Sequence, residues 1–342
     1  MTTPLAHILR VQGHPASGPV ELAVFGTADP DRIAGLITRA VQQQLGVAVA
    51  GGSFYSVSSG CVTGLDLADG RTVVLKAYQP HWEPAFLTAV QRVQRAAHQR
   101  GFPCPDPLAG PDPIGRGWAT LEAFLPDPGL PAPPRGGPSS PELLDASATA
   151  LVRLMACVDG VAADGLEQHP FRRGEGSLYP TPHSPIFDLD TTAEGAEWID
   201  EWAQRALALR DVASSPPVIS HLDWSARNVR LSPSHLLAVY DWDSLSLAPV
   251  AAAAGQSAAT WRSTGETSDT EAPDVGEIDR FLSAFATARG ASFTEAERSV
   301  AHGAALWVMA YSARCEHALE QRTPWRRTRA RDWLRTRAGD LL

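Results

Sequence analysis

Apolar residues in the first quarter of the chain change from helical spacing to alternating spacing near residue 50. Between residues 31 and 45 they recur every three or four positions up to Gly46, which predicts a helix. Three short segments rich in β-branched and aromatic residues follow, at residues 54–57, 61–67 and 72–78. The Asp69-Gly70 turn between the last two is a strong hairpin signal. The pattern predicts an antiparallel, β-rich region, and residues 19–26 are expected to form one more strand before the helix.

The rest of the chain is mainly helical in its spacing. We expect a helix at residues 84–100 and a strand at 118–124, and the Pro- and Gly-rich run that follows indicates a linker. Ser140 is a candidate helix cap, and Thr191 with Glu194 predicts a capping box. The helices expected in this second part lie at residues 140–158, 191–210, 247–261, 293–319 and after residue 324.

The stretch between residues 218 and 243 combines three short apolar segments with polar residues at their ends. It predicts a strand, a polar loop and a hairpin. His221, Asp223 and Asn228 fall in the loop, and Asp241 ends the last strand, so these side chains can converge on one side of a small sheet. Carboxylate and amide oxygens suit Mg²⁺, which usually takes one or two carboxylates and completes its shell with phosphate and water. The stretch therefore indicates nucleotide chemistry.

Composition narrows the class of protein. The net charge of −9 argues against a general nucleic-acid binder, while an acidic surface suits either a cationic small substrate or simple solubility. The chain has no apolar run of about 18 residues, as a membrane span would need, and no secretion signal at its start. Its four cysteines form no Cys-x-x-Cys pair, as expected of reduced thiols. We therefore expect a cytoplasmic protein of ordinary globular composition.

Lysine is nearly absent from this chain. Of the 29 basic residues 28 are arginine, and Lys76 is the remaining one. Because Arg and Lys are nearly interchangeable as exposed charges, a lysine kept in such a composition suggests a place where a compact ammonium group is needed. Contact with phosphate is one such place, and chance survival of a single lysine is the alternative.

The spacing His-x-Asp-x4-Asn from His221 to Asn228, followed after a hairpin by Asp-Trp-Asp at residues 241–243, resembles the catalytic loop and metal-binding Asp of eukaryotic-like kinases. The Asp-Trp-Asp form, with Gly-x-Pro-x-Pro at residues 101–105, is similar to the aminoglycoside phosphotransferase and choline kinase family. The resemblance covers roughly residues 50–320. It implies an α+β, bilobal protein-kinase-like fold with a small β-rich N-lobe and a larger, mainly helical C-lobe.

The same resemblance divides the chain into four parts. Residues 1–49 would form an N-terminal extension packed on the N-lobe, and residues 50–125 the nucleotide-binding N-lobe itself. Residues 126–139 would be a linker. Residues 140–342 would form the helical C-lobe, which carries the catalytic loop and the substrate site.

Carried over to this sequence, the resemblance assigns residues to ATP and Mg²⁺. Asp223 would accept the proton of the substrate hydroxyl, and Asn228 and Asp241 would hold Mg²⁺. Lys76 would contact the α- and β-phosphates of ATP. The other nucleotide contacts implied are the turn Ser58-Ser59-Gly60 over the phosphates and, at the adenine edge, backbone groups from Glu122 to Phe124.

The partner of the lysine stays open. In the family a Glu of the following helix pairs with it, but the helix expected at residues 84–100 contains no carboxylate. Glu83, at the start of this helix, is the favoured partner, because an uncompensated buried ammonium is costly. Gln91 or Gln94, deeper in the helix, could orient Lys76 by a neutral hydrogen bond instead.

Other residues near the catalytic loop also have two interpretations. Trp224, beside the base, is a candidate wall of the acceptor pocket. Arg227 either reaches the transferring phosphate or is simply exposed, and Asp243 either assists the metal or pairs with an arginine. Acidic residues cluster at 194–201 and again at 266–279, where they either bind a cationic substrate or are solvated.

We therefore expect an ATP- and Mg²⁺-dependent phosphotransferase that moves the γ-phosphate to a hydroxyl of a small, cationic molecule, such as an aminoglycoside or another antibiotic. A choline-, homoserine- or sugar-type kinase is an alternative, while a protein kinase is disfavoured because no Ala-Pro-Glu follows Asp241. A catalytically inactive nucleotide-binding scaffold is a further alternative, permitted by the glycine-poor turn and the missing helix Glu. We expect no nucleic-acid or membrane partner, and a monomer or a homodimer.

Overall fold

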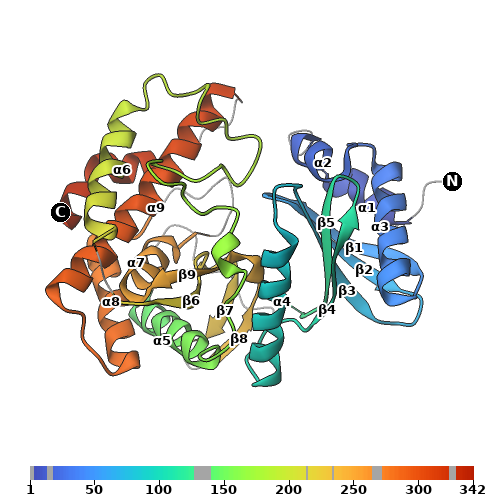
Figure 1. Cartoon of the computed structure of the whole chain (residues 1–342), viewed down its shortest axis with the longest axis horizontal. Helices are drawn as coiled ribbons and strands as arrows, with labels where there is room; N and C mark the ends of the chain where they lie inside the picture. The colour runs from blue at the N-terminus through green and yellow to red at the C-terminus, as the bar shows by residue number, and fades with distance from the viewer. Residues whose placement is uncertain are drawn as a thin grey trace.

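The computed structural model describes residues 4–13, 18–126, 140–212, 215–232, 235–263, 272–322 and 329–342. An antiparallel sheet with the N-terminal helices forms one lobe, and the later helices form the other (Figure 1). Helix α4 (Pro84–Gln99) stands between the two (Figure 1). This arrangement confirms the expected α+β, bilobal architecture. No helix in the described parts of the chain has the length and apolar composition needed to cross a membrane.

The sheet has the strand order β1-β2-β3-β5-β4, with every neighbouring pair antiparallel. Its strands are β1 (Val49–Val57), β2 (Cys61–Leu67), β3 (Thr72–Tyr78), β4 (Pro107–Ile114) and β5 (Gly117–Ala123). The strands expected at residues 54–57, 61–67, 72–78 and 118–124 are all present. Strand β4 was not predicted, because its sequence, PLAGPDPI, is rich in proline. Proline is tolerated there because β4 lies at the edge of the sheet, where backbone N–H groups facing outward need no partner.

Three helices precede the sheet: α1 (Pro4–Gln12), α2 (Gly18–Phe25) and α3 (Pro30–Leu45). Helix α3 was predicted, but the strand expected at residues 19–26 is wrong, since that segment is helix α2. Its Val20, Val24 and Phe25 are buried against the sheet. A short apolar run of this kind can form a strand or a buried helix, and periodicity alone does not separate them.

The helical lobe contains short strands as well as helices. Its elements are α5 (Pro141–Cys157), η2 (Leu166–Gln168), α6 (Glu197–Arg210), β6 (Pro217–His221), β7 (Val229–Ser232), β8 (His235–Val239), η3 (Trp242–Ser244), β9 (Leu245–Pro249), α7 (Val250–Thr260), α8 (Val275–Arg289), α9 (Glu295–Arg322), α10 (Arg329–Thr336) and η4 (Ala338–Leu341). The strand and hairpin expected between residues 218 and 243 are β6, β7 and β8. The expected cap at Ser140 is confirmed, because its side chain accepts the Leu143 N–H.

Two expected helix starts in this lobe are wrong. Helix α6 begins at Glu197 rather than near Thr191, whose N–H donates to Asp188 in a turn. Residues 247–249 belong to β9, which pairs with β6, and the alanine-rich helix starts only at Val250. Parts of other expectations lie outside the described residues: most of the linker at 126–139, Pro324, and the acidic residues Glu266, Asp269 and Glu271.

The buried apolar residues form two cores. One core joins α1, α2 and α3 to a single face of the five-stranded sheet. The other fills the helical lobe and includes Phe86, Leu87 and Val90 of α4. Helix α4 therefore packs on the helical lobe while it faces the second side of the sheet, and the residues between α4 and that side lie at the junction of the lobes.

Candidate active site

His221, the last residue of β6, anchors the loop that follows this strand. This side chain is fully buried, and its Nε2 atom donates to the Tyr240 carbonyl at 2.9 Å. Burial lowers the pKa of His221, which keeps the ring neutral. The residue thus joins the catalytic loop to the end of the β7–β8 hairpin, in a structural role rather than that of a base.

Asp223 and Asn228 are brought together by the turn between them. The Asn228 Nδ2 atom donates to the Asp223 backbone carbonyl at 3.0 Å and to its Oδ2 atom at 2.7 Å. Asn228 is buried, and its backbone carbonyl accepts the Tyr240 N–H at 2.8 Å. The asparagine therefore fixes the carboxylate of Asp223 and connects it to the segment that carries Asp241.

Asp241 follows β8 in an unusual backbone conformation. Its φ of 61° makes it the only non-glycine residue with positive φ in the described ranges. Strained backbone of this kind is found most often at functional sites. Burial alone would raise the pKa of Asp241, but the charges of Lys76 and Arg227 outweigh it and hold that pKa well below the usual value. The carboxylate is therefore ionised.

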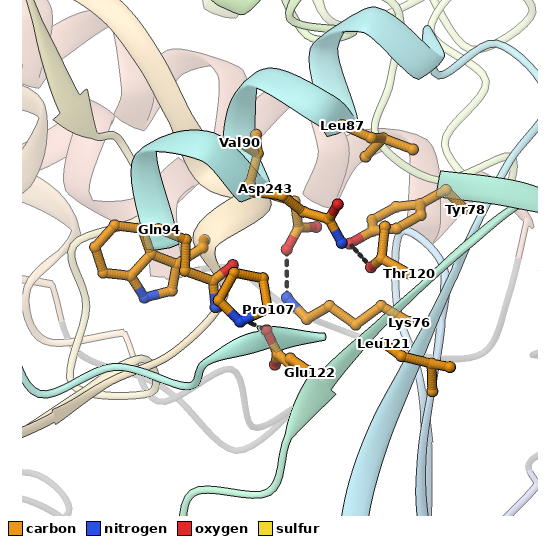
Figure 2. A pocket seen from close by; sticks show the side chains of 12 residues that line it. Lys76, Tyr78, Leu87, Val90, Gln94, Pro107, Thr120, Leu121, Glu122 and Asp243 are labelled. Carbon is orange, nitrogen blue, oxygen red and sulfur yellow. Dashed lines mark hydrogen bonds and ion pairs between the residues drawn. The ribbon is translucent and has the colours of Figure 1, made fainter. Parts of the chain in front are cut away.

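Lys76 on β3 points at this carboxylate. Its Nζ atom lies 2.9 Å from Asp241 Oδ1 and is also bonded to Asp243, as Figure 2 shows for the second contact. The lysine is buried, yet its pKa is raised, because the attraction of Asp241 and Asp243 exceeds the cost of desolvation. Lys76 therefore lies at the junction of the lobes, and both of its carboxylate partners come from the helical lobe.

The partners expected for Lys76 from the sequence are wrong. Glu83 occupies the cap position of α4, and no ion pair joins it to the lysine. Gln94 donates to Glu122 and to the Pro105 carbonyl, both at 3.0 Å. Gln91 donates to the Ala109 carbonyl at 2.7 Å. The helix glutamines therefore join α4 to the sheet edge and do not orient the lysine.

Asp243 had no firm role in the sequence, and the structure places it beside Lys76. The side chain is buried and lines the pocket shown in Figure 2. Burial and repulsion from Asp241 raise the pKa of Asp243 to about 7, although the lysine opposes the shift. The spacing Asp-x-Asp was the only signal in the sequence that could have marked this residue.

Glu122 contributes its side chain to the same pocket (Figure 2). Burial raises its pKa, with Lys76 and the Gln94 hydrogen bond acting in the opposite direction. The adenine contact expected along Glu122 to Phe124 stays a prediction. The N–H groups of Ala123 and Phe124 already donate to Asp106 and Thr72, so carbonyl groups or the exposed Phe124 ring would have to make it.

The turn Ser58-Ser59-Gly60 lies on the end of β3. A Cβ atom on Gly60 would come within 2.4 Å of the Ala77 carbonyl oxygen, so close packing requires glycine there. Gln79 donates to the Ser59 carbonyl at 2.6 Å and to the His183 carbonyl at 3.2 Å. The turn is thereby tied to the helical lobe, while its contact with phosphate stays a prediction.

Trp224 and Arg227 differ sharply in exposure. Trp224 is fully buried and donates to Ser147 on α5, so the expectation that it forms a wall of the acceptor pocket is wrong. Arg227 is exposed, and its side chain makes no hydrogen bond or ion pair with any described residue. Desolvation lowers its pKa less than the carboxylates of Asp223, Asp241 and Asp243 raise it. Arg227 is therefore a cation close to these three carboxylates.

Part of each acidic cluster is used within the protein. Asp200 accepts the Tyr179 hydroxyl at 2.9 Å, and Glu197 accepts the Gly195 N–H. In the second cluster Asp274 and Glu277 form the capping box of α8, and Asp279 accepts from His302. Solvated or structural roles account for these residues, and the remaining acids of the second cluster lie outside the described ranges.

Three features define the class of this protein as two-lobed, kinase-like phosphotransferases. They are a lysine on the third strand, a carboxylate held by an asparagine in the loop after β6, and an Asp-Trp-Asp turn at the lobe junction. The model of the phosphotransferase enzyme family matches residues 65–301, which is more than half of the chain. The chain belongs to this family, whose members are small-molecule phosphotransferases that act on hydroxyl groups.

Two solved structures illustrate the fold. An amicoumacin kinase, in complex with AMP-PNP, Ca²⁺ and Ami, is 12% identical with a TM-score of 0.58, covering 90% of this chain and 92% of that one. A spectinomycin phosphotransferase, in complex with ADP and spectinomycin, is 11% identical with a TM-score of 0.53, covering 90% and 96%. At such identities the likeness shows the fold alone. No curated protein sequence matches the chain significantly.

Proposed function

We propose that this phosphotransferase moves the γ-phosphate of ATP, with Mg²⁺, to a hydroxyl of a small molecule, and that the acceptor is an antibiotic or a similar natural product. The observation that carries the proposal is the Asp223–Asn228 pair. The Asn228 Nδ2 atom donates to the Asp223 carboxylate at 2.7 Å, which leaves the oxygen of the asparagine side chain for a cation. The AMP-PNP and ADP bound to the two solved neighbours support ATP as donor.

Asp223 is the group that accepts the proton of the hydroxyl. Its Oδ2 atom is fixed by Asn228, so its Oδ1 atom is available to the acceptor. The side chain is partly exposed, as contact with an acceptor requires. A carboxylate held in place supplies both orientation and base catalysis, and phosphoryl transfer depends on positioning and charge neutralisation rather than covalent help from the protein.

The donor set at Asn228 and Asp241 fits Mg²⁺. Asp241 is ionised, and Asn228 turns its NH₂ group toward Asp223, which leaves its oxygen for a metal. Nowhere in the described ranges do three or more His, Cys, Asp or Glu side chains form a metal site. Phosphate and water would therefore complete the shell, as Mg²⁺ prefers. When bound, the ion neutralises charge on the phosphates.

Lys76 and Arg227 supply the positive charge that the chain itself brings to the phosphates. Lys76 is buried and is held by two carboxylates, so it is placed before a nucleotide arrives. Arg227 is exposed beside Asp223, so its guanidinium can contact a phosphoryl group near the base. One cation therefore contacts Asp241 and Asp243, and the other lies near Asp223.

The acceptor need not be strongly cationic. Asp200, Glu197, Asp274, Glu277 and Asp279 of the acidic clusters all have partners within the protein, so these five offer no evident amine site. The neighbours' ligands, spectinomycin and Ami, favour an antibiotic-like acceptor. Neutral and cationic antibiotics are therefore both included in the proposed acceptor class.

The test is a transfer assay with ATP and Mg²⁺ against a panel of antibiotics, choline, homoserine and sugars. For the acceptor found, Asp223→Asn is expected to lower kcat by about 10² to 10⁴ while ATP affinity changes by less than about threefold. Asp190→Asn, at an exposed position, is the matched control and should behave as wild type. ATP binding without transfer to any acceptor would support the inactive scaffold instead.

A further inference from the structure

Helix α4 brings no negative charge to Lys76. Its sequence, PAFLTAVQRVQRAAHQ, contains no Asp or Glu. Its two buried glutamines, Gln91 and Gln94, already donate to groups of β4, β5 and the segment before β4. A buried ammonium left without a carboxylate would be strongly destabilised, so another element must supply the charge.

Asp243 supplies that charge from a rigid place. Its side chain is 10% exposed and that of Lys76 is 9% exposed, so the pair is almost closed to solvent. The neighbouring Trp242 is buried and donates to the Val239 carbonyl at 3.0 Å, while the Ser244 carbonyl accepts the Leu222 N–H at 3.0 Å. Because the turn is fixed on both sides of Asp243, this carboxylate has little freedom to leave the lysine.

Asp241 differs in each of these respects. Its side chain is 26% exposed, against 10% for Asp243. Apart from Lys76, its carboxylate accepts a long hydrogen bond of 3.4 Å from the Ser244 hydroxyl. It also lies next to Tyr240, whose N–H is bonded to Asn228. Asp241 is therefore the carboxylate that can turn toward a cation, and Asp243, whose contact with Lys76 is drawn in Figure 2, is the one that stays with the lysine.

We propose that Asp243 is a positioning residue: it holds Lys76 for contact with the nucleotide phosphates, in the role for which α4 has no carboxylate. The inference rests on the proposed use of ATP. It divides the Asp-Trp-Asp turn into two functions, with Asp241 directed to the metal and Asp243 to the lysine. The orientation of Lys76 is then set from the helical lobe and not by α4.

A double-mutant cycle between Lys76→Met and Asp243→Asn tests this assignment. ATP binding is measured by calorimetry in EDTA, and the KM for ATP and kcat are measured with Mg²⁺. In the wild-type background Asp243→Asn should weaken ATP binding and raise the KM by about tenfold, with a smaller change in kcat. In the Lys76→Met background the same substitution should change ATP binding by less than about twofold, because the group it acts through is gone.

Two further variants keep the test decisive if Asp243→Asn folds poorly. Asp243→Glu retains the charge and should recover part of the ATP affinity, while Glu83→Gln, at the start of α4, should match wild type. An equal effect of Asp243→Asn in both backgrounds, or a raised Mg²⁺ requirement in both, would make Asp243 a metal ligand and overturn the proposal. If wild type transfers phosphate to no acceptor while the cycle in EDTA holds, the proposed function fails and the assignment of Asp243 stands.

Discussion

The two faces of the five-stranded sheet are built from the same strands and serve different ends. Against α1, α2 and α3, β3 presents Leu75 and Ala77 and β5 presents Leu121, all buried in one apolar core. Against α4, β3 presents Lys76 and β5 presents Glu122. Because side chains alternate along a strand, a step of one residue on β3 passes from apolar core to charged site.

The difference separates stability from chemistry. Burying Leu75 is favourable by itself, whereas burying Lys76 is tolerated only because two carboxylates compensate its charge. Well-packed apolar residues would stabilise the second face at least as well. A buried charged cluster that local packing rules disfavour is therefore evidence of function at that face.

The largest expected effect concerns the apolar face. Leu75→Ala removes a fully buried side chain and should lower the free energy of unfolding by about 3 kcal/mol, through lost burial and the cavity left behind. Urea denaturation measures this change. The kcat of the folded enzyme should stay within about twofold of wild type. A loss of activity comparable to that of Lys76→Met would show that the two faces are not separate in function.

A smaller effect is expected where α4 meets the helical lobe. The His169 ring lies 5.1 Å from Phe86 of α4, and burial lowers its pKa from 6.5 to about 4. The unfolded chain therefore binds a proton that the folded chain does not, so stability falls as the pH drops from about 6.5 to about 4. After allowance for the partial exposure of His169, the free energy of unfolding falls by roughly 2 kcal/mol over this pH range.

His169→Gln removes this titration and is the variant for comparison. Unfolding free energies of wild type and variant, measured by urea between pH 4 and 7, should draw closer to each other as the pH falls, since only wild type carries this loss. Carboxylates contribute to acid unfolding equally in both proteins, so their contribution cancels when the two unfolding free energies are subtracted. Parallel curves would mean that His169 accepts a proton in the folded protein, and that the contact with α4 is looser than described.

The smallest effect is expected at Glu122. Burial raises its pKa, so a neutral side chain costs little there, and glutamine can still accept the Gln94 hydrogen bond. Glu122→Gln should change the free energy of unfolding by less than about 1 kcal/mol and the KM for ATP by less than about threefold. Equilibrium unfolding and steady-state kinetics provide the two measurements. A large rise in KM would indicate that Glu122, rather than Asp243, holds the lysine.

Much of the site was readable from the sequence because its parts are local. The loop from His221 to Asn228 and the hairpin up to Asp241 form a continuous segment, and Lys76 was marked by composition. The partner of the lysine was not readable, since 167 residues separate Lys76 from Asp243. That contact depends on how the lobes pack, and a sequence pattern carries no information about such a distance.

The errors in the fold have equally physical causes. Strand β4 carries three prolines, which normally argue against a strand, and only its place at the sheet edge permits them. Helix α2 is a short apolar run whose burial on the sheet overrides the strand-like appearance of its Val residues. Trp224 follows Asp223 in sequence, but its indole enters the core toward Ser147, because neighbouring residues in a turn point in different directions.

The prolines of β4 also affect how copies of this protein meet one another. An uncovered edge strand offers backbone N–H and C=O groups on which a second chain can add a strand and start aggregation. Pro107, Pro111 and Pro113 remove three of those donors from one edge. At the other edge the Tyr55 N–H of β1 is already bonded to the Gln12 side chain at 2.6 Å. Each edge of the sheet therefore offers fewer free donors to a second chain than an unmodified strand would.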